Sequence, residues 1–377
     1  MINASKDPVE IKISIQQPVV TRYAFYTVGF ISESDTAQEY VEVSSLKDVL
    51  DSGYSVGSAA YVFCNLLFSQ TNRPDSAILI AKKTTESYAQ AYSRNRTKDY
   101  YFLVLETKNI NEILEVSTLV NSLNDYKLIF FSTTEDVALQ VTGIDNLVWW
   151  YFTDYIISDN GGYVSSDADF ALQTEVSIYP EAAILGRCAN NFPSTIQWSL
   201  KELNDLEVES PIPNYYTGTQ TWKFDSSLVM VWDSGAETAT QFTGIESYSQ
   251  VYELYPLANY YAQVLDTPIT WGSGTTTSGE WIDIKVFTDW MKWAIQQRIW
   301  KLLKTSLKVP ATEQGAEQIK LCLKEVLDFS VQQQGIEKYE IKKHILNRSS
   351  RSLSINFNFS YSHSINAAQG VTGYLTF

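Results

Sequence analysis

The sequence predicts a mixed α/β or α+β protein of more than one domain, with a strand near each end of the chain. Strand-like apolar runs alternate with amphipathic, helix-like segments between residues 23 and 152, and both terminal regions alternate strictly between apolar and polar residues. The chain has 377 residues, more than the roughly 100–200 of a typical single domain.

The first part of the chain predicts a parallel sheet with crossover helices. The helix over 44–53 has Ser45 placed as its cap, Asp48 three residues later and Gly53 at its stop. A strand, a helix and a strand at this spacing imply parallel pairing. No element is predicted for the polar stretch 82–99, and no glycine-rich phosphate loop joins a strand to a helix. The predicted strands are 23–32, 76–81, 100–106, 127–133 and 146–152, and the other helices are 55–70 and 110–123.

The last third predicts a loop and two helices. The loop "WGSGTTTSGEWID" (271–283) lacks the ending of a phosphate-binding P-loop, so its glycines are expected to allow tight turns. A helix is predicted over 286–305, and a second begins after Pro310 with Thr312 as its cap and stops at Gly335–Ile336. A shift in composition around Pro211 and Pro213 indicates a domain boundary there.

The charge is unevenly distributed. The chain carries a net charge of −15, yet residues 285–351 hold 13 Lys or Arg against 7 Asp or Glu. The acidic total argues against a nucleic-acid binder, which needs a basic footprint. The basic segment suggests a negatively charged partner, although a solvated helix surface is the simpler explanation. Its centre is a stripe at helical spacing: Arg298, Lys301, Lys304 and Lys308.

The residues give no support for an enzyme. Three widely spaced cysteines and two histidines (Cys64, Cys188, Cys322, His344, His363) offer no metal or disulfide framework, and a reducing cytoplasm suits them. Asp283 and Asp289 are explained more simply by the helix start between them than as a catalytic pair. We therefore expect no catalytic residue, cofactor or metal. No apolar run reaches the ~18 residues that span a bilayer, so no membrane insertion is expected.

The two terminal strands indicate self-association. Alternating side chains give each strand one apolar and one polar face. Such a strand either closes a sheet of its own chain or pairs with another chain. The apolar positions are Val9, Ile11, Ile13 and Ile15 at one end and Leu353, Ile355, Phe357, Phe359 and Tyr361 at the other.

Several segments together resemble the contractile tail sheath proteins of long-tailed bacteriophages, with relatives in phage-tail-like bacteriocins and type VI secretion. The resemblance covers about half of the chain, in the family's order. It rests on "FISES" (30–34), "SSLKDVLDSGYSVGSAAYVFCNLLFSQTNRPDSAILIAKK" (44–83), "NYYAQV" (259–264), "SGEWID" (278–283), "DWMKWAIQQRIWKLL" (289–303) and "KVPATEQGAEQI" (308–319).

The resemblance implies a multi-domain fold. It implies an extended N-terminal arm (1–22), an outer α/β domain (23–213), an inner sheath domain (214–350) and a C-terminal strand arm (351–377). Each arm would add a strand to a neighbouring subunit's sheet.

It also implies a structural role without enzymatic activity. Hexameric rings would stack helically around the tail tube of a virion made in the host bacterial cytoplasm, and contraction would drive the tube through the host envelope. The implied partners are other copies of the chain, the tail tube protein, and baseplate and tail terminator proteins. The alternative, suggested by 24 Tyr and 10 Trp, is a glycan-binding or baseplate-associated phage surface protein.

Overall fold

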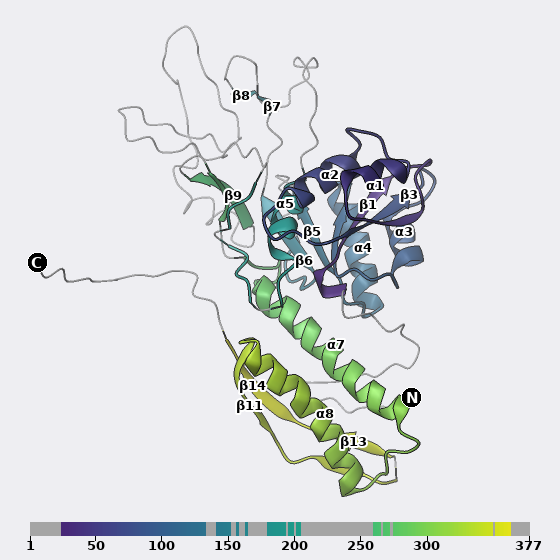
Figure 1. Ribbon diagram of the computed structural model, residues 1–377, viewed down its shortest axis with the longest axis vertical. Coiled ribbons are helices and arrows are strands. Elements are labelled where there is room, and N and C mark those ends of the chain that lie inside the picture. The colour runs from purple at the N-terminus through teal and green to yellow at the C-terminus, as the bar shows by residue number, and fades with distance from the viewer. Residues whose placement is uncertain are drawn as a thin grey trace, which may run out of the picture. The chain divides into compact units, whose positions relative to one another are not determined.

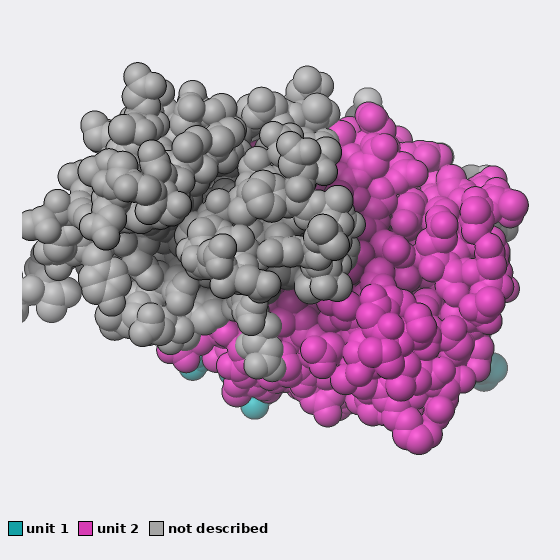
Figure 2. All heavy atoms as spheres, turned by 90° about the horizontal axis from the view of Figure 1, so that it is seen from above, with its two compact units in different colours: residues 1–25, 191–197, 283–377 teal, residues 26–190, 198–282 magenta. Residues whose placement is uncertain are grey.

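A computed structural model describes most of the chain in two compact units. Unit 2 comprises residues 26–190 and 198–282, and unit 1 comprises 1–25, 191–197 and 283–377 (Figure 2). The described residues are 24–132, 141–151, 156–157, 163–164, 179–193, 195–199, 201–204, 259–264, 267–271, 274–349 and 351–362.

Unit 2 is built on an eight-stranded sheet of order β10-β9-β6-β5-β4-β1-β3-β2 (Figure 1). Strands β3, β1, β4, β5, β6 and β9 run parallel, and β2 and β10 pair antiparallel at the two edges. The parallel sheet predicted from the sequence is therefore confirmed. The strands are β1 (Val28–Glu33), β2 (Tyr40–Val43), β3 (Ala77–Lys82), β4 (Phe102–Leu105), β5 (Leu128–Ser132), β6 (Leu147–Tyr151), β9 (Asn259–Val264) and β10 (Thr267–Trp271).

Helices cover both faces of this sheet because both faces of its strands are apolar. On one face, α3 (Tyr88–Asn95) and α4 (Ile110–Ser122) bury residues such as Tyr92 and Ile113 against strand residues such as Ile31. On the other face Phe30, the neighbour of Ile31 in β1, stacks on Phe63 of α2 (Ala59–Phe68) at 4.2 Å between ring centroids.

Small residues and caps position the remaining helices of unit 2. Helix α5 (Pro180–Cys188) lies so close to α2 that a Cβ on Gly186 would stand 2.4 Å from the carbonyl oxygen of Leu67. Helix α1 (Leu46–Asp51) begins with the predicted capping box of Ser45 and Asp48. Unit 2 also includes the paired strands β7 (Ile156–Ile157) and β8 (Tyr163–Val164). The short 3₁₀ helix η1 (Ala24–Tyr26) crosses the boundary between the units, which lies between Phe25 and Tyr26.

The sequence-based prediction missed two helices, α3 and α5. Helix α3 lies in the polar stretch 82–99, where a second capping box joins Ser87 and Gln90. That pair of residues is the signal that marks the helix, and its buried face carries tyrosine and alanine rather than leucine.

Asn259, the first residue of β9, connects the glycine- and threonine-rich loop to the sheet through hydrogen bonds. Its amide nitrogen donates to the carbonyl oxygens of Trp149 (3.0 Å) and Thr275 (2.9 Å), and its amide oxygen accepts from the N–H of Thr275 (3.0 Å). Gly274 and Gly279 have φ values of +66° and +85°, so the predicted tight turns are confirmed.

The units divide at residue 283, whereas the composition around Pro211 placed a boundary near residue 213. Pro211 and Pro213 lie outside the described residues. Strands β9 and β10, expected in the inner domain, belong to the sheet of unit 2 because β9 pairs with β6.

Unit 1 consists mainly of a helix pair and a long hairpin. Helix α7 (Ile282–Thr305) begins at the last residue of unit 2, and α8 (Glu313–Gln332) follows it. The hairpin legs are β11 (Ile336–Ile341) with β12 (Ile345–Asn347), and β13 (Ser352–Ser354) with β14 (Phe357–Tyr361). The apolar sides of α7 and α8 are buried through residues that include Phe287, Met291, Ile295, Leu323 and Leu327.

Candidate assembly interface

The hairpin of unit 1 ends the described part of the chain. β11 pairs antiparallel with β14, placing Tyr339 opposite Phe359, and β12 pairs with β13, placing Leu346 opposite Leu353. A backbone hydrogen bond of 2.8 Å from Lys342 to Asn356 joins the two paired sections. The two legs are therefore joined from the Ile336–Tyr361 pair at one end to the Asn347–Ser352 pair at the other.

A Schellman motif directs the chain from α8 into this hairpin. The N–H of Gly335 donates to the carbonyl of Ser330, and that of Gln334 donates to the carbonyl of Val331, each at 2.9 Å. The residue with a left-handed backbone is Gln334, at φ +59°. The predicted stop is confirmed, but its left-handed residue comes one position before the glycine.

The apolar face of β14 packs inside its own unit. Phe357 is buried, the Phe359 ring lies 4.9 Å from that of Tyr361, and the Tyr361 ring meets Phe287 of α7 at 6.1 Å. The hydroxyl of Tyr361 is 2.6 Å from that of Thr288, also on α7. The aromatic side chains of this strand therefore hold the hairpin on α7.

This arrangement differs from the expectation for the C-terminal strand. Leu353, Phe357, Phe359 and Tyr361 pair with β12 and β11 of the same chain, and Ile355 lies half-buried between β13 and β14. Closing a hairpin between neighbouring segments costs little chain entropy, which favours pairing within the chain. Val9, Ile11, Ile13 and Ile15 lie outside the described residues.

The hairpin still has edges that a further strand could use. β11 and β14 form a two-stranded sheet, so each has a single neighbour among the strands that the structure describes. β11 presents the exposed polar side chains of Glu337, Lys338 and Glu340, and its register shifts between Ile336 and Lys338. Charged residues and irregularities of this kind limit unspecific pairing at sheet edges. A segment with a matching pattern can add to such an edge through main-chain hydrogen bonds.

The basic stripe is divided by the structure. Arg298 forms an ion pair with Glu325 of α8 and so joins the two helices. Lys301 and Lys304 are exposed on α7, with the Lys304 ammonium 5.4 Å from the centroid of the Trp300 ring. Lys308 is exposed but lies beyond the end of α7 at Thr305. Three lysines, rather than four residues on one helix, therefore form the exposed basic surface.

The turn between α7 and α8 explains why a glycine, Gly315, stands five residues after Pro310. A Cβ on Gly315 would lie 1.9 Å from the carbonyl oxygen of Pro310, so this close approach requires glycine. Thr312 occupies the N-cap position, but its side chain makes no capping hydrogen bond. The predicted helix start is confirmed, whereas the predicted side-chain cap is wrong. The backbone N–H of Thr312 donates to the carbonyl of Pro310 (2.8 Å), which closes the turn before the helix.

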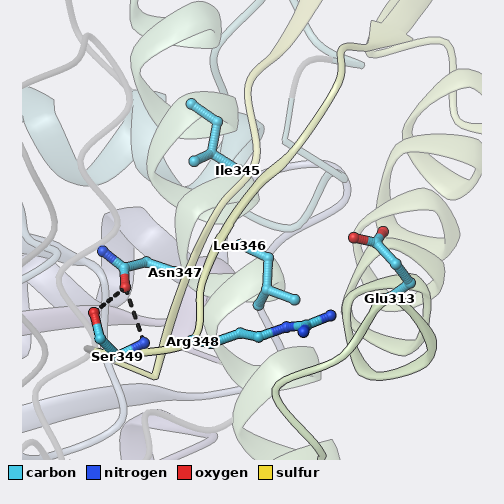
Figure 3. A pocket seen from close by; sticks show the side chains of 6 residues that line it. All are labelled: Glu313, Ile345, Leu346, Asn347, Arg348 and Ser349. Carbon is cyan, nitrogen blue, oxygen red and sulfur yellow. Dashed lines mark hydrogen bonds between the residues drawn. The ribbon is translucent and has the colours of Figure 1, made fainter.

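A pocket of about 600 Å³ lies between the hairpin tip and the start of α8. In Figure 3, Arg348 extends across it toward Glu313, and Asn347 accepts hydrogen bonds from the N–H (3.1 Å) and hydroxyl (2.7 Å) of Ser349. His344 contacts Glu313 at 2.8 Å and ties the hairpin to α8. Asn347 and Ser349 are thus engaged in the turn at the hairpin tip, and Glu313 in the contact with His344.

The two carboxylates considered for catalysis make contacts within the fold, Asp283 with the N–H of Ile284 and Asp289 with Lys285. Asp289 is buried and pairs with Lys285 (3.1 Å). At the carboxyl ends of β1 and β4, where doubly wound sheets bind phosphates, Glu106 accepts from the Ser32 hydroxyl (2.8 Å) and would repel an anion. Among the described residues, no group of three or more His, Cys, Asp or Glu side chains could hold a metal ion. No described helix is both long and apolar enough to cross a membrane.

Comparison with known proteins finds solved structures with a similar fold. No protein-family model matches the sequence, and no curated protein matches it either. Among solved structures, a chain of the baseplate of the anti-feeding prophage matches with a TM-score of 0.60 and 12% identity, over 99% of each chain. A sheath tail protein from Listeria innocua matches with a TM-score of 0.55 and 8% identity, over 90% of this chain and 92% of that one. This chain therefore has a tail-sheath-like fold, as the resemblance in its sequence predicts.

Proposed function

We propose that this protein is a structural subunit of a contractile bacteriophage tail sheath. Its copies would form hexameric rings stacked helically around the tail tube, in a virion assembled in the bacterial cytoplasm. The observation that supports this proposal best is the match of the entire chain, over 99% of both lengths, to a chain of a six-fold symmetrised assembly. Contraction would be a change between two packings of the subunits that drives the tube through the host envelope.

The hairpin of unit 1 would receive strands from neighbouring copies. The N-terminal arm (1–22), with Val9, Ile11, Ile13 and Ile15, fits an edge of the β11–β14 pair by its alternation. Because β14 pairs within its own chain, the C-terminal arm is placed after it, in residues 363–377. A contact of this type is heterologous, so its repetition builds rings or open helices rather than a closed dimer.

The exposed lysines would face an acidic partner, either the tail tube or the next subunit. Single exposed ion pairs contribute roughly 0–1 kcal/mol each. Lys301, Lys304 and Lys308 would therefore contribute substantially to the free energy of assembly only through repetition around a ring. Baseplate and tail terminator proteins would bind the two ends of the array.

Electron microscopy of the purified full chain, alone and with tail tubes, tests the proposal. Tubes or hexameric rings are expected, and variants lacking residues 1–16 or 363–377 are expected to remain folded monomers. Tubes formed by both deletion variants would exclude the arm contacts, while a compact monomer that binds sugars would favour the glycan-binding alternative.

The role of the lysines is tested by assembly on tubes at low and high salt. Lys301→Glu/Lys304→Glu should weaken assembly at low salt. Lys292→Glu/Lys324→Glu changes two other exposed lysines of unit 1, one on α7 and one on α8, and serves as the control. If both double variants assemble equally at every salt concentration, Lys301 and Lys304 are ordinary solvated surface residues with no role in assembly.

A second candidate function is a baseplate component, because the anti-feeding prophage match comes from a baseplate structure. Immunogold labelling of assembled tails separates the two candidates. Label along the whole tail supports the sheath, and label confined to one end supports the baseplate.

A further inference from the structure

We propose that residues 18–23 dock along the exposed apolar side of α7 in the same chain and so anchor the N-terminal segment. The inference does not depend on the proposed function, since it concerns a single copy. It starts from two features of unit 1: an aromatic contact made by Phe25, and a row of apolar side chains on α7.

The position of Phe25 places the C-terminal end of the preceding segment. Its ring lies 5.6 Å from that of Trp293 on α7, with the planes tilted by 56°. Phe25 itself is buried, at 1% exposed. The segment before Phe25 therefore starts its course at the surface of α7.

A row of apolar side chains leads away from this contact. Trp293 and Trp300 are seven residues apart and so share one side of the helix, and both are half-buried. Next to Trp300, Leu303 is 43% exposed, and Leu307, just past the helix, is fully exposed. We call these four residues the α7 row. Large apolar side chains exposed side by side are typical of a surface that binds another chain segment, protein or ligand.

The length of the preceding segment fits the row. From Trp293 to Leu303 the helix rises about 15 Å, at roughly 1.5 Å per residue. Six residues of extended chain, 18–23, span about 20 Å, at roughly 3.3 Å per residue. A segment that leaves Phe25 along the helix thus reaches Leu303 without strain.

The chemistry of the segment also fits. It includes Pro18, Val19, Val20 and Tyr23, which match an apolar surface. Between residues 13 and 24 the sole charged residue is Arg22, which lies close to Phe25 in the chain and so at the end of the row away from the lysines. The part that meets Lys301, Lys304 and Lys308 is uncharged, so docking brings no like charges together.

Docking would divide the N-terminal segment into two functional parts. Pro18 has no N–H to donate to a strand ladder, so it separates the alternating stretch 9–16 from the docked residues. The docked part would hold the root of the segment on its own subunit, and the alternating stretch would extend beyond it.

A disulfide trapping experiment on the full-length double variant Val20→Cys/Leu303→Cys tests this arrangement. Mild oxidation at a concentration where the protein is monomeric should give an intrachain disulfide, identified by peptide mass spectrometry. The native cysteines Cys64, Cys188 and Cys322 are buried, which keeps background reaction low. The control Val20→Cys/Leu321→Cys places the second thiol on α8, at a side chain 57% exposed, and should crosslink at least tenfold less. A disulfide between two copies, or equal yields at Leu303 and Leu321, would overturn the proposal.

Limited trypsin digestion gives an independent measurement. Leu303→Glu/Leu307→Glu should release the segment and raise the rate of cleavage after Arg22 by about tenfold, while Leu321→Glu should leave it unchanged. Circular dichroism establishes that each variant is folded. Equal cleavage rates in folded wild-type and double-variant protein would also overturn the proposal.

Discussion

Replacing Asn259 with alanine should destabilise unit 2 by about 3–5 kcal/mol. The side chain is completely buried and makes three hydrogen bonds of 2.9–3.0 Å to the backbone of Trp149 and Thr275. Each such bond contributes a net amount of about 1 kcal/mol, which gives about 3 kcal/mol. Removing a buried partner also adds a desolvation cost of about 1–3 kcal/mol, partly relieved by relaxation. The expected range follows from these two contributions.

Urea unfolding followed by circular dichroism measures the loss of stability, and hydrogen exchange locates it. The amide of Thr275 bonds to the Asn259 side chain, so its exchange should accelerate most. The amide of Thr277 bonds to the carbonyl of Leu147 and should change less. Asn111→Ala, an exposed position on α4, is the control and should change stability by less than about 0.5 kcal/mol. A loss below about 1 kcal/mol with unchanged exchange at Thr275 would refute the reasoning.

Three further changes test other parts of the structure. Gly315→Ala should destabilise unit 1 by about 1–3 kcal/mol despite the better helix propensity of alanine, because its Cβ would overlap the Pro310 carbonyl; a rise in the melting temperature would contradict this. Phe357→Asp should lower the free energy of unfolding of unit 1 by about 3 kcal/mol or more, because it buries a carboxylate without a partner. A change below about 0.5 kcal/mol in urea unfolding would contradict the burial of this side chain. Burial lowers the pKa of Lys127 to about 7, so the unfolded state binds more protons between pH 7 and pH 10 and stability should rise with pH there, by up to about 1.4 kcal/mol per pH unit. Lys127→Met should reduce the rise of the free energy of unfolding with pH, measured in unfolding curves from pH 6.5 to 9. An unchanged rise in this variant would mean that other titratable groups cause the pH dependence.

Local patterns in the sequence were sufficient for most elements of unit 2 and for the helices of unit 1. Continuous apolar runs identified β1, β3, β4, β5 and β6, because strands covered on both faces carry few polar residues. Capping residues such as Ser45 identified helix starts, because the orphan N–H groups at a helix start need a side-chain acceptor close in sequence. Helix α3 was missed because its signal lay in a capping box and not in a row of large apolar residues.

The sequence by itself indicated extended structure with one apolar, largely aromatic face between residues 352 and 361, since alternation is a property of the chain alone. The structure divides this stretch into β13 and β14. The tertiary structure decided which strand pairs with β14: β11 of the same chain, with Tyr361 resting on α7. It also decided that Arg298 belongs to the contact between α7 and α8. Pairing partners and ion pairs depend on residues far apart in sequence, so periodicity cannot specify them, whereas the helices and strands follow from interactions between near neighbours.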